Sequence, residues 1–95
     1  MTKAKLIQAI AQKTGLTKLE TQAVLTGFWD TVIESLAQGE SVELRGFGSF
    51  RVQHRPPRKA RNPATGESIQ VDARRVPVFK PAREFKDQVN QPLDE

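Results

Sequence analysis

A stretch in the middle of the chain, residues 55–75, limits what the rest of the sequence can fold into. It carries basic side chains and prolines but few apolar ones, so it is poorly suited to a folded core. Little more than three-quarters of the 95 residues is left to bury apolar surface, which is marginal for a single copy. We therefore expect one domain over residues 1–95, with residues 55–75 projecting as an arm and a second subunit adding burial.

Charge is distributed unevenly along the chain. Residues 1–50 carry no net charge, whereas residues 51–86 hold ten basic and three acidic side chains, and the charges of the last nine residues are all acidic. Random scatter would rarely concentrate the whole excess in one region. The pattern indicates a neutral scaffold that presents a basic surface, as expected of a protein that binds a polyanion.

Several classes of function lack support in the sequence. There is no Cys, and His54 is the only His, so no metal site or other cofactor is expected; His54 itself is interpreted as a strand residue at the base of the arm. No paired carboxylates, nucleophile–base pair or Gly-rich phosphate loop indicate an enzyme. No apolar run reaches the ~18 residues of a membrane span, and no signal peptide opens the chain. We expect a soluble, intracellular protein.

The first 40 residues are predicted to form two helices. Thr2 caps the first, and Gly15 suits the left-handed residue that follows a helix. Thr17 and Glu20 match a capping box at the start of a second helix over residues 18–38. The second helix has an apolar stripe wider than one packing face needs, which favours a dimer interface: Val24, Leu25, Phe28, Trp29, Val32, Ile33, Leu36 and Ala37.

Beyond Gly39 the apolar pattern changes to period two. Residues 41–45 and 47–52 alternate on either side of a turn at Gly46 and Gly48, residues 68–72 read as a return strand, and residues 76–79 as a third sheet strand with Pro77 at an edge. Pro81 is expected to begin a helix over 82–90, and 91–95 to be a frayed tail. The predicted fold is α+β, with a sheet from 41–54 and 76–81.

The arm ends in a predicted turn, Asn62-Pro63-Ala64-Thr65-Gly66, on a stem with Arg55, Arg58, Lys59 and Arg61. Pro56-Pro57 should loosen strand pairing at its base. Both faces of the stem are expected to be polar. One interpretation is an ordinary solvated hairpin. The favoured one is an arm in the DNA minor groove, whose Pro63 wedges between base pairs and kinks the duplex.

Four segments give the chain a specific resemblance to a known family. They are Gly15-Leu16-Thr17, Glu43-Leu44-Arg45-Gly46-Phe47-Gly48-Ser49-Phe50, Arg61-Asn62-Pro63-Ala64-Thr65-Gly66 and Val76-Pro77-Val78-Phe79-Lys80-Pro81. In this order, and over about residues 1–90, they resemble the HU / integration host factor family of bacterial histone-like DNA-bending proteins. The resemblance implies an intertwined dimer with a helical base, a saddle-shaped sheet and two arms that wrap double-stranded DNA.

The resemblance also implies roles for particular residues. Pro63 is the intercalating residue, and Lys3 matches a basic position near flanking DNA. Further DNA contacts are implied on the arm, the saddle and the last helix: Arg55, Arg58, Lys59, Arg61, Asn62, Arg74, Arg75, Lys80, Arg83 and Lys86. Arg74 and Arg75 would lie on the return strand of the arm. Ala60, Ala82, Gln53 and Pro56-Pro57 depart from the family's usual residues, so the direction of the arm is left in question.

Alternatives remain open at this point. The chain is predicted to organise the bacterial nucleoid in the cytoplasm with little sequence specificity, or to be a sequence-specific, integration-host-factor-like subunit, which Arg74-Arg75 and the longer C-terminus favour. Less favoured is a single-strand binder that stacks bases on Phe47, Phe50 and Phe79, or a protein-interaction module. A homodimer and a heterodimer with a paralogue both fit.

Overall fold

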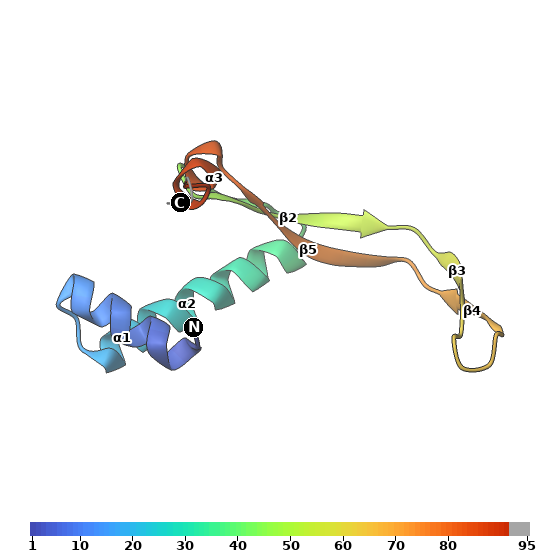
Figure 1. Cartoon of the computed structure of the whole chain (residues 1–95), viewed down its shortest axis with the longest axis horizontal. Coiled ribbons are helices and arrows are strands. Elements are labelled where there is room, and N and C mark those ends of the chain that lie inside the picture. Colours follow the sequence, from blue (N-terminus) through green and yellow to red (C-terminus); the bar gives the residue numbers. More distant parts are fainter. Residues whose placement is uncertain (92–95) are drawn as a thin grey trace. The chain divides into compact units, whose positions relative to one another are not determined.

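The computed structural model describes residues 1–91. The chain divides into two compact units, one over Met1–Ser35 and one from Leu36 onward, and each is described by itself. Two helices precede five strands and a final helix (Figure 1). The sequence predicted these helices and four of the strands, with the stem continuing the second strand rather than forming a strand of its own. The elements are α1 Lys3–Thr14, α2 Lys18–Ala37, β1 Val42–Leu44, β2 Gly48–Arg55, β3 Arg58–Arg61, β4 Ser68–Val71, β5 Arg74–Pro81 and α3 Arg83–Val89.

The predicted helix ends of the first unit are confirmed. The Thr2 hydroxyl accepts from the Lys5 N–H, and Gly15 follows α1 with φ of 78°. At the start of α2 the Thr17 N–H donates to Glu20 Oε1 at 2.9 Å, and the Glu20 N–H donates to Thr17 Oγ1 at 3.0 Å. The Thr17 backbone, and next its side chain, hold the pKa of Glu20 below its usual value. This cap therefore stabilises α2 at neutral pH, and the contribution is lost as pH falls through that lowered pKa.

The apolar stripe of α2 is only partly covered within one chain. Val32 and Leu36 are buried, but Val24 is 64% exposed and Ile33 61% exposed, and Phe28 is also exposed. Apolar side chains at this spacing and exposure are typical of an interface between subunits. Over residues 1–91, every helix falls short of the length and apolarity needed to cross a bilayer.

The second unit is built on a three-stranded antiparallel sheet in the order β1-β2-β5. The turn predicted at Gly46 joins β1 to β2, where the Phe47 N–H donates to the Leu44 carbonyl at 3.0 Å. Pro77 lies on β5, an edge strand, as predicted. Strands β3 and β4 form a separate two-stranded ribbon, and Pro56-Pro57 occupies the gap between β2 and β3. The predicted loss of pairing at these prolines is thus confirmed.

Four phenylalanines form an aromatic cluster in the second unit, in which Phe47 is 41% and Phe79 36% exposed. Phe79 lies between the others, with ring centroids 5.2 Å from Phe47, 4.9 Å from Phe50 and 5.9 Å from Phe85. Phe85 attaches α3 to this cluster, its ring nearly perpendicular to that of Phe47 at 5.0 Å. The prediction that Pro81 begins this helix is wrong: Pro81 is the last residue of β5, and Ala82 is the N-cap. The backbone of Ala82 is still extended like that of the strand, because the Ala82 N–H donates a hydrogen bond to the Phe47 carbonyl.

Gly48 is where the backbone of β2 comes closest to β5. A Cβ built at Gly48 would lie 2.5 Å from the Lys80 carbonyl oxygen and 2.6 Å from the Phe79 ring. Neither the paired backbone nor a packed ring can move away cheaply. We expect Gly48→Ala to lower the free energy of unfolding by about 2–3 kcal/mol, as overpacking does. Urea denaturation at a fixed protein concentration measures this, with Ser49→Ala as a control expected to change it by less than about 1 kcal/mol.

Candidate nucleic-acid interface

The predicted contact residues on β2 and β5 lie on the two faces of the three-stranded sheet. Strand register puts Arg55 opposite Arg74 and Ser49 opposite Lys80, and alternation along β2 and β5 places all four side chains on one face of the sheet. The other face carries Phe50 and Phe79. We call the first face, defined by Arg51, Gln53, Arg55, Arg74 and Lys80, the basic sheet face.

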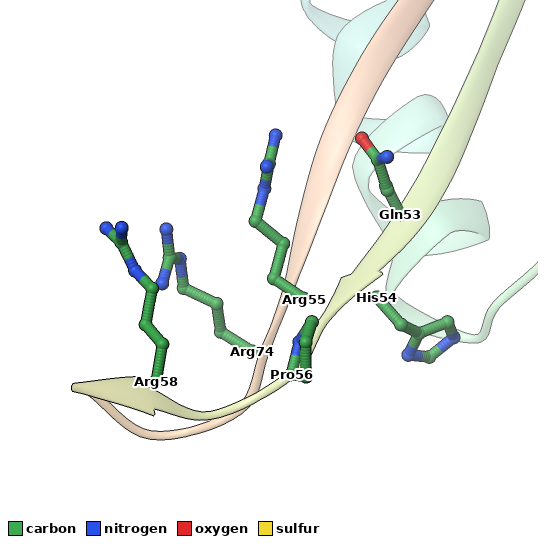
Figure 2. A pocket seen from close by; sticks show the side chains of 6 residues that line it. All are labelled: Gln53, His54, Arg55, Pro56, Arg58 and Arg74. Carbon is green, nitrogen blue, oxygen red and sulfur yellow. The ribbon is translucent and has the colours of Figure 1, made fainter. Parts of the chain in front are cut away.

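Three arginines gather at the outer end of this face. Figure 2 shows Arg55, Arg58 and Arg74 pointing to the same side of the ribbon, around a hollow of about 330 Å³ that Gln53, His54 and Pro56 help to line. Arg58 belongs to β3, so the basic side continues past the gap at Pro56-Pro57. Within residues 1–91 none of these three guanidinium groups is in an ion pair.

Like charges directly opposite each other on paired strands are destabilising. The Arg55–Arg74 pair therefore costs stability in the free protein, and no acidic side chain of the described residues pairs with either arginine. An anion placed between the two guanidinium groups would remove the repulsion. Phosphate oxygens suit arginine well because its guanidinium group can donate two parallel hydrogen bonds. The outer end of the sheet is therefore a candidate phosphate-binding site.

Arg75 does not join this group, although it is next to Arg74. It pairs with His54 across β2 and β5, and both side chains lie on the opposite face. In Figure 2, His54 points away from the three arginines. Its place on β2 confirms the interpretation of His54 as a strand residue. Within residues 1–91, no cluster of three or more His, Cys, Asp or Glu side chains could hold a metal ion.

Sequence reasoning did not single out Arg51, which lies on the basic sheet face two residues from Gln53. Its Nε donates to the Ser49 hydroxyl at 3.1 Å, and its guanidinium group is 3.7 Å from the Glu43 carboxylate. These contacts hold Arg51 over the sheet between Lys80 and Arg55. The signal was present, because counting back from Arg55 in steps of two leads to residue 51.

The ribbon formed by β3 and β4 also has two unlike faces, so the prediction that both are polar is wrong. Arg58 pairs with Val71 and Ala60 with Ile69, which puts Ala60, Ile69 and Val71 together on one face. We call these three the apolar ribbon face. On the other face Lys59 pairs with Gln70, and Arg61 with Ser68. Reading β3 alone misled the prediction, because the apolar residues come mainly from β4.

The tip of the ribbon is a closed, internally bonded turn. Asn62 takes part in three of the hydrogen bonds that close this turn. Its N–H donates to the Glu67 carbonyl at 2.8 Å, and its own carbonyl accepts from the Gly66 N–H at 2.7 Å. Its side-chain Oδ1 accepts from the Ala64 N–H at 2.8 Å. Gly66 is left-handed, with φ of 76°, as predicted. Pro63 is exposed at the end of this turn. The turn therefore supports an exposed apolar ring at the farthest point of the arm.

The remaining predicted contacts lie elsewhere. Arg83 and Lys86 are exposed on α3, where Arg83 Nε is 4.0 Å from the Asp87 carboxylate. Lys3 belongs to α1 in the other unit, and its Nζ lies 4.6 Å from the centre of the Trp29 ring. The Phe rings considered as base-stacking platforms pack against one another, and the ribbon has no aromatic residue. The geometry thus gives less support to single-strand stacking than to groove binding.

Known proteins are similar to this chain over nearly its whole length. Residues 1–90 match the family model described as "Bacterial DNA-binding protein". Integration host factor subunit beta of Methylococcus capsulatus is 46% identical over 95 residues, covering 99% of this chain and all of that protein. DNA-binding protein HU of Geobacillus stearothermophilus is 43% identical over 89 residues, covering 94% and 99%. An Anabaena HU–DNA cocrystal structure matches with a TM-score of 0.91 and 41% identity, covering 97% of this chain and all of the other.

Proposed function

Because the chain belongs to the bacterial DNA-binding protein family, together with HU and the integration host factor subunits, we propose that it is an architectural protein that binds and bends double-stranded DNA. The observation that carries the proposal is the unpaired arginine group at the base of a ribbon with an exposed proline at its tip. Arginines at the base would neutralise phosphates, and Pro63 would separate two base pairs.

In this proposal the binding energy comes from basic side chains that contact phosphates. The DNA bends because a bent duplex makes more of these contacts. Unstacking a base step costs a few kcal/mol, which is offset when the bent duplex meets more basic surface. Arg51, Arg55, Arg74 and Lys80 would provide that surface in the sheet, and Arg58 would extend it at the start of the ribbon. Lys59, Arg61 and Asn62 would contact the backbone from the arm. Arg75, and Arg83 and Lys86 on α3, would contact the DNA backbone, and Lys3 would lie near flanking DNA.

We further propose that the active form is a dimer with two arms. The support is the exposed apolar stripe of α2, where Val24, Phe28 and Ile33 need covering. The partner is a second copy or a paralogue, and mass spectrometry of the protein purified from its own cells distinguishes them. The proposed setting is the nucleoid in the bacterial cytoplasm, and the proposed role is structural rather than enzymatic.

A DNA-bending assay on the wild-type protein tests the function directly. Energy transfer between dyes on the two ends of a duplex should rise on binding, and affinity should fall with salt at a log–log slope near −0.9 for each phosphate neutralised. A flat salt dependence, or binding without a change in energy transfer, would contradict the proposal. A selection from random duplexes then separates the branches: a recovered motif favours integration-host-factor-like specificity, and its absence favours HU-like binding.

A further inference from the structure

The apolar ribbon face is not fully covered within the arm itself. A two-stranded ribbon has no interior, so Ala60, Ile69 and Val71 cannot be covered by strand pairing alone. Ile69 is 44% exposed, whereas Ala60 and Val71, which lie beside it, are half-buried. An apolar strip here therefore points to a ligand that covers it.

The position of the strip relative to the arginines indicates which ligand. Val71 is paired with Arg58, so Arg58 lies on the same face as the strip. Figure 2 shows Arg58 on the same side as Arg55 and Arg74. The side that gathers guanidinium groups at the base of the arm therefore becomes apolar toward the tip. This surface begins with arginines that can bind phosphate and ends with aliphatic side chains. Such a surface suits the groove of a duplex, because the groove has charged phosphates at its rims and sugars along its walls.

From this juxtaposition we propose that the apolar ribbon face lies against the deoxyribose walls of the minor groove, and that Ile69 makes the arm select DNA over RNA duplexes. The inference rests on the proposed function and assigns a specificity to one face of the arm. Lys59 and Arg61, on the other face, reach phosphates by bending their long side chains around the ribbon.

Selectivity follows from the chemistry of the two sugars. The minor groove of a DNA duplex exposes C–H groups of deoxyribose, which an aliphatic side chain can cover without loss. The minor groove of an RNA duplex is wide and shallow and displays 2′-hydroxyl groups. If Ile69 covered a 2′-hydroxyl, that hydroxyl would lose its hydrogen bonds to water, and Ile69 could not replace them. The apolar face therefore gains burial on DNA and meets a penalty on RNA.

The test is Ile69→Thr in the full-length chain, with Ile69→Val as the matched control. Threonine keeps the β-branch that suits a strand but replaces an apolar branch with a hydroxyl. We expect Ile69→Thr to weaken binding to a DNA duplex about tenfold for each arm that contacts it, from lost apolar burial. Binding to the RNA duplex of matching sequence should stay within about twofold or tighten, because the new hydroxyl can bond to the 2′-hydroxyl.

Two further measurements separate this role from others. The salt dependence of DNA binding should keep its slope, since no phosphate contact is removed. Ile69→Val should bind both duplexes like the wild type. Unchanged DNA affinity in Ile69→Thr, or equal losses on DNA and RNA, would overturn the inference even if the wild type bends DNA. Failure of the wild type to bend DNA would instead overturn the proposed function.

Discussion

Replacing Arg55, Arg58 and Arg74 together by Gln should weaken binding to duplex DNA more than any other change to the arm and sheet. The three guanidinium groups share one side of the ribbon and have no acidic partner in the described residues. Each phosphate contact contributes about −0.9 to the slope of log affinity against log salt concentration. At about 0.1 M salt, this corresponds to a roughly eightfold gain in affinity for each contact. Loss of all three should cost about 500-fold there and flatten the slope by about 2.7 for each arm.

The control must remove the same charge from elsewhere. Lys5, Lys13 and Lys18 lie in the helical unit, outside the proposed interface, and their triple replacement by Gln lowers the net charge equally. That variant should keep the wild-type salt slope. It should lose affinity for DNA only because the lower net charge weakens the long-range electrostatic attraction. Equal losses in the two triple variants, measured by anisotropy over a salt series, would mean that total charge rather than the arginine group binds DNA.

Local sequence signals predicted much of the fold. The capping residues Thr2 and Thr17 and the turn glycines act through hydrogen bonds and backbone angles within a few residues, so each can be read without knowing the rest of the chain. The same holds for Pro56-Pro57, which lack the N–H donors that strand pairing needs. The tip was predictable for the same reason, since Asn62 and Gly66 bond to each other.

The parts that sequence reasoning missed depend on which residues of different strands face each other. Arg55 and Arg74 are far apart in sequence, and only the β2–β5 register makes them a pair. The apolar ribbon face needs the β3–β4 register in the same way, because Ala60 alone does not reveal it. A shift of one residue in either register would exchange the two faces. Composition could therefore predict a basic arm but not which of its sides meets the groove.

The three-stranded sheet and the β3–β4 ribbon are supported differently. Strands β2 and β5 are joined to the phenylalanine cluster through Phe50 and Phe79, so the arginines at their ends have a supported base. The ribbon of β3 and β4 is separated from that base by Pro56-Pro57, where hydrogen bonding between strands is interrupted. Phosphates held at the base would fix the start of the arm, and groove contacts would then direct the tip. In this proposal, binding strength and bending would depend on different residues.

Pro63→Ala tests that separation, since it changes the tip without changing charge. We expect it to abolish most of the rise in energy transfer that marks bending, because an alanine methyl group is too small to hold two base pairs apart. The salt slope should be unchanged, and affinity for intact duplex should fall by less than about tenfold, since the phosphate contacts remain. The wild type should prefer nicked over intact duplex, because a nick lowers the cost of kinking, and this preference should diminish in the variant.

Alanine also frees the backbone of the turn, so a second variant must distinguish the wedge from the stiffness of the tip. Pro63→Leu loses the fixed φ of proline but keeps an apolar side chain of a kind that other minor-groove proteins insert between bases. If Pro63 acts as a wedge, bending should return in Pro63→Leu while Pro63→Ala stays straight. If turn stiffness matters instead, the two variants should fail together, and the wedge role of Pro63 would be wrong even though the turn is held by Asn62.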